Sequence, residues 1–328
     1  MARRAPPLLA ALLLFAGCGS AGSSGDSAPD SPRDIVLPRG AYPSNLLATP
    51  DGSLWISESG EAVARRLPDG KVRQYRLPGS ENSPGDMEVG PDGGIWIAGF
   101  EEFIRIDPRT GSIGIGADFG PHPNPEVGLP ESVAAGPDGA VWFGDGANPA
   151  DLLRVEPDGS TSTWSLPGVE GEAFINGMVL GPDQAIWLSL GVGYDGGSSR
   201  IGRFTPDGDL RLWDLPPHRD PGQIVVGPDH ALWFSEGNNH IGRISTGGKL
   251  SEFRLRPGLA VNEVAPGGGD SLWFTTRKRV GRISTSGQFE TWVVPGADYL
   301  YGIAPAPDGG AWVSDGPGDR VRYFRPPS

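Results

Sequence analysis

The sequence of 328 residues contains little cysteine and little positive charge. Its one cysteine, Cys18, excludes a disulfide within the chain. The 27 lysine and arginine residues are outnumbered by 40 aspartate and glutamate residues, which gives a net charge of −13. Nucleic acids and anionic lipid surfaces attract a basic protein face, so this charge argues against either of them as a direct partner.

The N-terminus lacks an apolar run long enough to anchor the chain across a bilayer. Residues 8–15 are apolar, whereas a transmembrane helix needs about 20 such residues. Arg3 and Arg4 precede this run, so residues 1–17 are predicted to be a secretory leader. The run ends in Phe-Ala-Gly-Cys at residues 15–18, which resembles a bacterial lipobox with phenylalanine where leucine is more usual. The resemblance implies cleavage before Cys18 and lipidation of its thiol.

An ordinary leader followed by a free thiol is the alternative interpretation of this segment. Residues 18–33 consist mainly of Gly, Ser, Ala, Asp and Pro, a composition typical of a flexible tether. We therefore expect an extracytoplasmic lipoprotein of the cell envelope or periplasm, attached to the membrane only through its lipid. Residues 34–328 would form the folded domain, held off the membrane surface.

Glycine and proline are abundant, with 52 and 34 residues, and there are ten tryptophans. So many helix-breaking residues exclude a mainly helical fold. The tryptophans argue against disorder, because disordered chains are poor in large aromatic side chains. Both observations hold if glycine and proline form the turns of a protein with many short strands.

A repeat accounts for this composition. Seven copies of a turn followed by alternating apolar residues are centred on tryptophans spaced 39 to 46 residues apart: Trp55, Trp96, Trp142, Trp187, Trp233, Trp273 and Trp312. A Gly-Arg strand such as Ile241-Gly242-Arg243-Ile244 and a second turn follow most copies. Four short strands per repeat at this spacing predict an all-β, seven-bladed β-propeller with four-stranded blades.

The seventh repeat lacks its fourth strand, because the chain ends after the third. Residues 34–38 resemble the fourth strands of the other repeats and precede the first strand of repeat one. We therefore predict that this N-terminal strand completes blade seven and closes the ring, which removes exposed sheet edges. An unpaired N-terminal arm is the alternative.

The candidate site lies on the face opposite the regular turns, where the repeat varies. In each repeat, one variable position begins the first strand and another ends the second strand. Ring symmetry is expected to bring both sets around one mouth of the central channel, while the tryptophans pack between blades. The candidate ligand-binding residues are Glu58, Asp145, Asn176, Asn262, Arg277, Tyr299, Tyr301 and Asp315.

Carboxylate and amide oxygens at this mouth suit Mg²⁺ or another divalent cation. Glu131, Asn176 and Asn262 would add ligands to the acids at the strand ends, and Asp86 and Glu263 directly follow two strand-start positions. The alternative is that each carboxylate is solvated or pairs with an arginine such as Arg277.

One stretch resembles the virginiamycin B lyase family. Residues 227–236 read Gly-Pro-Asp-His-Ala-Leu-Trp-Phe-Ser-Glu, and residues 239–244 read Asn-His-Ile-Gly-Arg-Ile. The resemblance implies a seven-bladed propeller that opens the ester ring of a cyclic depsipeptide antibiotic by Mg²⁺-assisted elimination. It also implies catalytic histidines that begin first strands, and a glutamate that ends the second strand of the same blade.

The sequence departs from that family pattern at the histidines. The first-strand positions hold Ser44, Gly85, Glu131, Asn176, Gly222, Asn262 and Tyr301. Glu58 and Glu236 match the family glutamate, but neither has a histidine at its partner position. His122 and His240 do not stand at the strand-start positions where the family pattern places its histidines.

Three functions therefore stay open. The residues at the mouth favour a monomeric binding propeller that takes a small molecule, glycan or peptide. A lyase would use Glu131, Glu236 or Glu263 as its general base, with Mg²⁺ stabilising the developing charge. A lactonase-type hydrolase would use an oxygen-ligated metal, although propellers of that kind usually have six blades.

Overall fold

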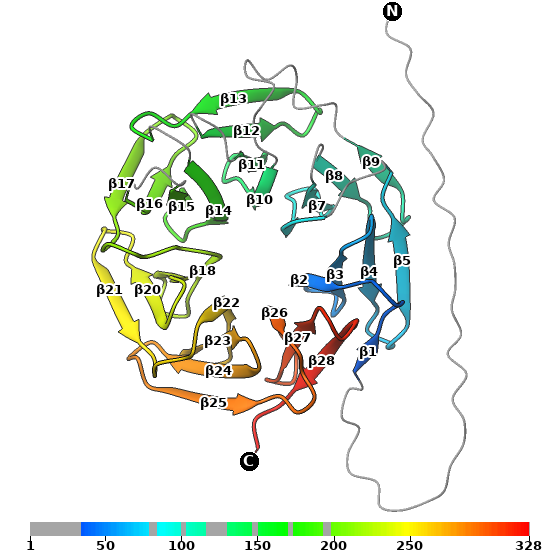
Figure 1. The fold of residues 1–328 in the computed structure, drawn as a ribbon. Helices are drawn as coiled ribbons and strands as arrows, with labels where there is room; N and C mark the ends of the chain where they lie inside the picture. The colour runs from blue at the N-terminus through cyan, green and yellow to red at the C-terminus, as the bar shows by residue number, and fades with distance from the viewer. Residues whose placement is uncertain are drawn as a thin grey trace, which may run out of the picture.

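The computed structural model describes residues 34–78, 84–99, 103–115, 130–145, 150–169, 173–192 and 198–327. They form seven four-stranded antiparallel sheets arranged radially around a central channel (Figure 1). The seven-bladed propeller predicted from the repeat is thereby confirmed. The described ranges contain no helix of the length and apolar character needed to cross a bilayer.

The first four blades follow one another along the chain. Blade one contains β2 (Pro43–Ala48), β3 (Leu54–Glu58), β4 (Ala62–Arg66) and β5 (Val72–Arg76). Blade two contains β6 (Met87–Val89), β7 (Ile95–Ala98), β8 (Phe103–Ile106) and β9 (Ile113–Ile115). Blade three contains β10 (Pro130–Ala135), β11 (Val141–Asp145), β12 (Asp151–Val155) and β13 (Thr161–Ser165). Blade four contains β14 (Ala173–Leu180), β15 (Ile186–Val192), β16 (Arg200–Phe204) and β17 (Leu210–Asp214).

The last three blades bring the chain back to its start. Blade five contains β18 (Ile224–Val226), β19 (Leu232–Ser235), β20 (His240–Ile244) and β21 (Leu250–Arg254). Blade six contains β22 (Val261–Pro266), β23 (Ser271–Thr276), β24 (Arg279–Ser284) and β25 (Phe289–Val293). Blade seven contains β26 (Leu300–Pro305), β27 (Ala311–Asp315), β28 (Arg320–Phe324) and the N-terminal β1 (Ile35–Val36).

The N-terminal strand closes the ring, as the sequence predicted. In β1, Ile35 pairs with Val321 and Val36 pairs with Arg320, both antiparallel. The Leu37 amide extends this pairing with a hydrogen bond to the carbonyl of Asp319. Ile35 and Leu37 are both buried, in a cluster that joins blade seven to blade one.

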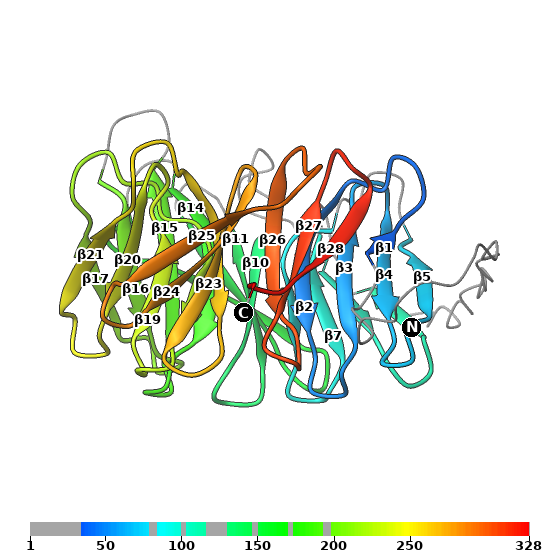
Figure 2. The same ribbon diagram turned by 90° about the horizontal axis from the view of Figure 1, so that it is seen from below.

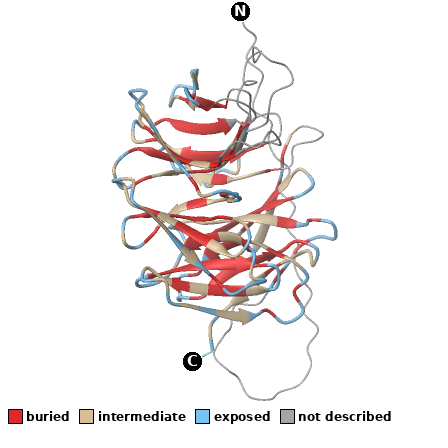
Figure 3. Cartoon of the chain, turned by 60° about the vertical axis from the view of Figure 1, so that its left-hand side comes forward, coloured by how far each residue is buried: buried red, intermediate tan, exposed pale blue. Residues whose placement is uncertain are grey.

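The tryptophans of the repeat pack between blades. Trp55 lies against Met87, Ile95 and Ile97 of blade two. Trp312 of blade seven shares a cluster with Leu54 of blade one, so the ring is continuous. Each of these clusters contains buried apolar residues from two neighbouring sheets. Figure 3 colours the buried residues of the chain red. The core is therefore a ring of interfaces rather than a single centre.

The turn between the first and second strands carries a polar contact that the sequence did not reveal. In blade five, one carboxylate oxygen of Asp229 accepts a hydrogen bond from Trp233 Nε1 at 2.9 Å, and the other accepts one from Arg243 Nε at 2.7 Å. Despite burial, these bonds hold the pKa of Asp229 below its usual value. The same Asp–Trp–Arg unit recurs in blades two, three and four, with Asp92, Asp138 and Asp183.

These units lie on one face of the disc. Figure 2 shows the disc from the side, with the turns and connections of the blades gathered on its two faces. The regular face is thus occupied by contacts that hold strands together, and the variable residues lie on the opposite face.

Deleting residues 34–38 should destabilise the propeller, because β28 would then have an exposed edge and the Ile35 and Leu37 contacts would be lost. Burying each of these side chains is worth about 1.5–3 kcal/mol. We expect a fall of several degrees or more in the melting temperature by circular dichroism. A chain that begins at residue 34 is the control and should melt like the full chain. Equal melting temperatures for the deletion and the control would contradict the closure.

Candidate functional site

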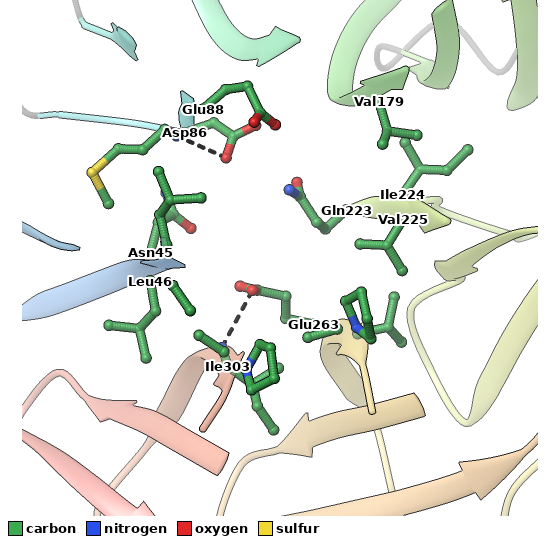
Figure 4. Close-up of a pocket in the computed structure, with 18 of the residues that line it drawn as sticks. Asn45, Leu46, Asp86, Glu88, Val179, Gln223, Ile224, Val225, Glu263 and Ile303 are labelled. Carbon is green, nitrogen blue, oxygen red and sulfur yellow. Dashed lines mark hydrogen bonds between the residues drawn. The ribbon is translucent and has the colours of Figure 1, made fainter. Parts of the chain in front are cut away.

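The first strands of the blades line the central channel. They enclose a cavity of about 320 Å³ whose walls are largely aliphatic, with side chains such as Leu46, Val179 and Ile224. Figure 4 shows the carboxyl groups of Asp86 and Glu263 entering this cavity from opposite blades. No arginine, lysine or histidine is among the described residues that line it.

A second cavity of about 230 Å³ lies at the channel mouth and shares three lining residues with the first. We name it the mouth cup. It is lined by Ser44, Asn45, Asn176, Gln223, Asn262, Glu263 and Tyr301. The structure thus brings together four of the candidate residues, Asn176, Asn262, Glu263 and Tyr301, from blades four, six and seven.

Irregular pairing between first and second strands occurs at most of the cup residues. In β22, the register with β23 shifts between Val261 and Val264, so Asn262 and Glu263 lie in the irregular segment. The register shifts likewise at Ser44 and Asn45 in β2, at Asn176 in β14 and at Tyr301 in β26. Bulges re-aim side chains, and they are common next to functional sites.

Hydrogen bonds between blades fix the orientation of two cup amides. Asn176 Nδ2 donates to the carbonyl of Pro221 at 2.7 Å, and Asn262 Nδ2 donates to the carbonyl of Leu300 at 2.6 Å. The first bond reaches the connection that leads into blade five, and the second reaches the first residue of β26 in blade seven. The two side chains are thereby held in one orientation before any ligand arrives.

Second-strand hydroxyls reinforce the same ring. Ser189 Oγ donates to the carbonyl of Gly222, and Ser314 Oγ donates to the carbonyl of Ser44, both at 2.6 Å. The blades approach closely here, since a Cβ on Gly302 would lie 2.3 Å from the Ser44 carbonyl oxygen. The cup is therefore built on a rigid frame.

Burial changes the acid–base properties of the channel carboxyls. It raises the pKa of Glu263 to about 8, even though Glu263 Oε1 accepts a hydrogen bond from the Ile303 amide at 3.2 Å. Burial also raises the pKa of Asp86 to about 6 and that of Glu88 to about 7. All three groups can hold or release a proton near neutral pH.

The acids that end second strands in blades one and seven do not reach the cup. Both carboxylate oxygens of Glu58 accept hydrogen bonds from Gln74 Nε2, at 3.0 and 3.1 Å. Burial raises the pKa of Glu58 to about 7. Asp315 accepts from Arg322 Nε at 2.8 Å and from the amides of Asp298 and Tyr299. These acids make structural contacts inside their own blades.

Glu236 is fully buried inside blade five. Arg219 Nε lies 3.6 Å from its Oε2 atom, and neither carboxylate oxygen has a hydrogen bond among the described residues. Gly242 leaves room for the carboxylate, because a Cβ there would lie 2.8 Å from Oε1. Burial and the neighbouring Glu252 raise the pKa of Glu236 to about 8. Burial, followed by the charge of Arg219, lowers the pKa of the nearby His240.

The remaining candidates divide into three groups. Tyr299 joins the rim of the cup, because its ring centroid lies 4.5 Å from that of Tyr301 and its hydroxyl donates to Asn262 Oδ1 at 3.4 Å. Arg277 is exposed between β23 and β24. The side chains of Glu131 and Asp145, together with all of Cys18 and His122, lie outside the described residues.

Sequence reasoning missed three contributors. Asn45 and Gln223 each follow a strand-start position that was identified, and their polar side chains were the available signal. Tyr42 lies at the rim, where its hydroxyl hydrogen-bonds that of Tyr301 at 2.9 Å. Asp319 holds the left-handed backbone at Tyr42, φ 43°, by accepting hydrogen bonds from the amides of Gly40 and Tyr42.

The described ranges contain no group of three or more His, Cys, Asp or Glu residues placed to hold a metal ion. The expected convergence of strand-end acids does not occur among the described side chains, because Glu58, Glu236 and Asp315 lie in separate blades with partners of their own. The mouth cup is instead a polar site of amides, hydroxyls and one carboxyl group.

Comparison with known proteins gives a consistent family. The model of the Virginiamycin B lyase family matches residues 35–318. A virginiamycin B lyase of Nocardia farcinica is 28% identical over 186 residues, which are 56% of this chain and 59% of that protein. A gluconolactonase of Zymomonas mobilis is 30% identical over 160 residues, 43% of this chain and 41% of that protein. The chain thus matches less than two thirds of each of these relatives.

A solved structure extends the similarity to nearly the whole fold. It is a catalytically inactive histidine-to-alanine variant of virginiamycin B lyase from Staphylococcus aureus with quinupristin. It is 26% identical to this chain and has a TM-score of 0.77, and the alignment covers 89% of this chain and 97% of that one.

Replacing Glu236 with glutamine should stabilise the protein more at pH 8 than at pH 5. In wild type, the raised pKa means that the folded state keeps a proton that the unfolded state releases above its ordinary pKa of 4.5. Stability therefore falls as pH rises from about 5 to about 8, and the variant lacks this contribution. We expect the difference in melting temperature, variant minus wild type, to grow by a few degrees across this range.

Glu290→Gln is the matched control, since Glu290 is exposed on an outer strand. Its melting temperature should follow wild type at both pH values. A Glu236→Gln difference that is independent of pH would contradict the raised pKa.

Proposed function

Because the chain belongs to the virginiamycin B lyase family, we propose that it retains the family's propeller as a ligand-binding protein. Its ligand is a small molecule, glycan or peptide that sits in the mouth cup. The observation that carries this proposal is the composition of the cup. Oriented amides, hydroxyls and a single carboxyl group suit recognition by hydrogen bonding.

The positions of the histidines support binding over catalysis. Of the described histidines, His218 and His230 are exposed, and His240 lies in blade five beside Arg219 and Glu252. None of them lines the mouth cup. The inactive relative bound to quinupristin carries a histidine-to-alanine change, so that enzyme's activity requires a histidine. Asn176 and Tyr301 stand at strand-start positions, where the family resemblance implies histidines. An asparagine amide cannot act as a base.

A carbon–oxygen lyase is the second candidate function. Family membership favours it, and Glu263 is a carboxyl group at the mouth with a pKa of about 8, which suits a general base. The described residues do not supply a three-carboxylate or carboxylate–histidine set for Mg²⁺, so we derive no metal-assisted step. A lactonase-type reaction would need an oxygen-ligated metal, and the described residues do not supply a group of three or more metal-binding side chains for it either. The gluconolactonase match that supports this reaction covers less than half of each chain.

We further propose that the propeller works outside the cytoplasm. The basic and apolar leader and the lipobox-like Phe-Ala-Gly-Cys support export and lipidation at Cys18. The tether at residues 18–33 would place the cup away from the membrane, where it can meet ligands of the envelope.

Incubating the purified protein with quinupristin and Mg²⁺ tests binding against catalysis. We expect no ring-opened product by mass spectrometry, because no described histidine faces the cup. An authentic virginiamycin B lyase under the same conditions is the positive control. Linear product that forms with wild type and disappears in Glu263→Gln would replace the binding proposal with the lyase.

A further inference from the structure

The mouth cup offers hydrogen-bond acceptors and aromatic faces without a positive charge. This inference deepens the proposed function and rests on it, since it identifies the chemical class of the ligand. We propose that the cup binds an organic ammonium cation, with Glu263 as its counter-ion and the tyrosines of the rim as its aromatic wall.

Two amides of the cup have a fixed orientation. Asn176 and Asn262 use their Nδ2 groups on the carbonyls of Pro221 and Leu300. This places the NH₂ corner of each amide against the neighbouring blade and leaves the carbonyl corner for the cup. Asn262 Oδ1 accepts only a long bond, 3.4 Å, from the Tyr299 hydroxyl. These two amides therefore present acceptors to a ligand that is rich in donors or positively charged.

Glu263 is a carboxyl group of the cup that has no cationic partner among the described lining residues. Its Oε1 atom accepts a hydrogen bond from the Ile303 amide, and its carboxyl group points into the cavity (Figure 4). No arginine, lysine or histidine is among the described residues lining the cup or the channel beneath it. A buried carboxylate without a cation is costly, which is consistent with the raised pKa of Glu263. A bound cation would supply the missing charge.

Tyrosines gather at the rim of the cup. Tyr301 lines the cup, its ring lies 4.5 Å from that of Tyr299 and 5.8 Å from that of Tyr42, and its hydroxyl hydrogen-bonds that of Tyr42. Of the three rings, Tyr301 lines the cup together with Glu263, and Tyr299 and Tyr42 extend the aromatic surface from it at the rim. Aromatic faces attract ammonium groups through the ring quadrupole, and aromatic walls are a recurrent way of binding quaternary ammonium.

Size and polarity fit a compact head group. The cup measures about 230 Å³ and opens into the largely aliphatic channel cavity of about 320 Å³. A cation with an apolar substituent could place its charge at Glu263 and its substituent between Leu46 and Ile303.

Calorimetric titration with choline and with its uncharged isostere, in which a tert-butyl group replaces the trimethylammonium group, tests the proposal. We expect choline to bind at least about tenfold more tightly than the isostere, since desolvated ammonium–aromatic and carboxylate contacts together exceed the free energy of a tenfold change. Equal affinities would overturn the assignment, because shape alone would then account for binding.

Variants separate the charge from the rings. Glu263→Gln should weaken choline binding about tenfold and leave the affinity for the isostere unchanged. Tyr301→Ala should also weaken choline binding, whereas Tyr301→Phe, which keeps the ring, should bind choline like wild type. Glu290→Gln makes the same charge change on the exposed edge of the same blade and should have no effect. An unaltered choline affinity in Glu263→Gln, with a wild-type melting temperature, would overturn the role of the carboxylate.

A neutral probe distinguishes failure of this inference from failure of the proposed function. If choline does not bind but chitotriose does, and Asn176→Leu abolishes that binding, the cup is a binding site for another class of ligand. If neither probe binds, both proposals fall.

Discussion

Blades two to five depend on one set of polar contacts, made by the carboxylate of the aspartate in the turn between the first and second strands. In blades two to five, one Asp side chain binds the indole N–H of the second strand and the guanidinium of the third. These bonds satisfy two donors that would otherwise be costly to bury. Blade seven achieves a related contact differently, through the hydroxyl of Tyr323 on Asp308. The regular face is therefore committed to structure, which leaves the opposite face free to vary.

The geometry of radial sheets explains why the site has few components. A blade presents the edge of its first strand to the channel, and the side chains of its second strand face the neighbouring blades. Asn262 and Glu263 reach the mouth because they lie on a first strand, in an irregular segment. Glu236 ends a second strand, so its carboxylate turns into blade five and meets Arg219.

The same geometry determines what could be predicted from the sequence. The tryptophan repeat predicted the blades, and the similarity of residues 34–38 to other fourth strands predicted the closure through Ile35 and Val321. Of the strand-start positions, Asn176 and Tyr301 lie together at the mouth cup. The strand-end acids such as Glu58 lie away from it, because their side-chain direction depends on strand register and on local partners such as Gln74, which no repeat pattern encodes. The rim position of Tyr42 depends on a left-handed backbone held by Asp319, near the other end of the chain.

The pairing of β1 with β28 has a consequence for the order of folding. Blades one to six each consist of strands that are consecutive in the chain, so each can assemble locally from a segment of modest length. Blade seven alone joins strands from both ends, since Val36 pairs with Arg320. The ring can therefore close only after the last residues have been synthesised. Until then the first strand has no partner, although it is the first part of the propeller to be made.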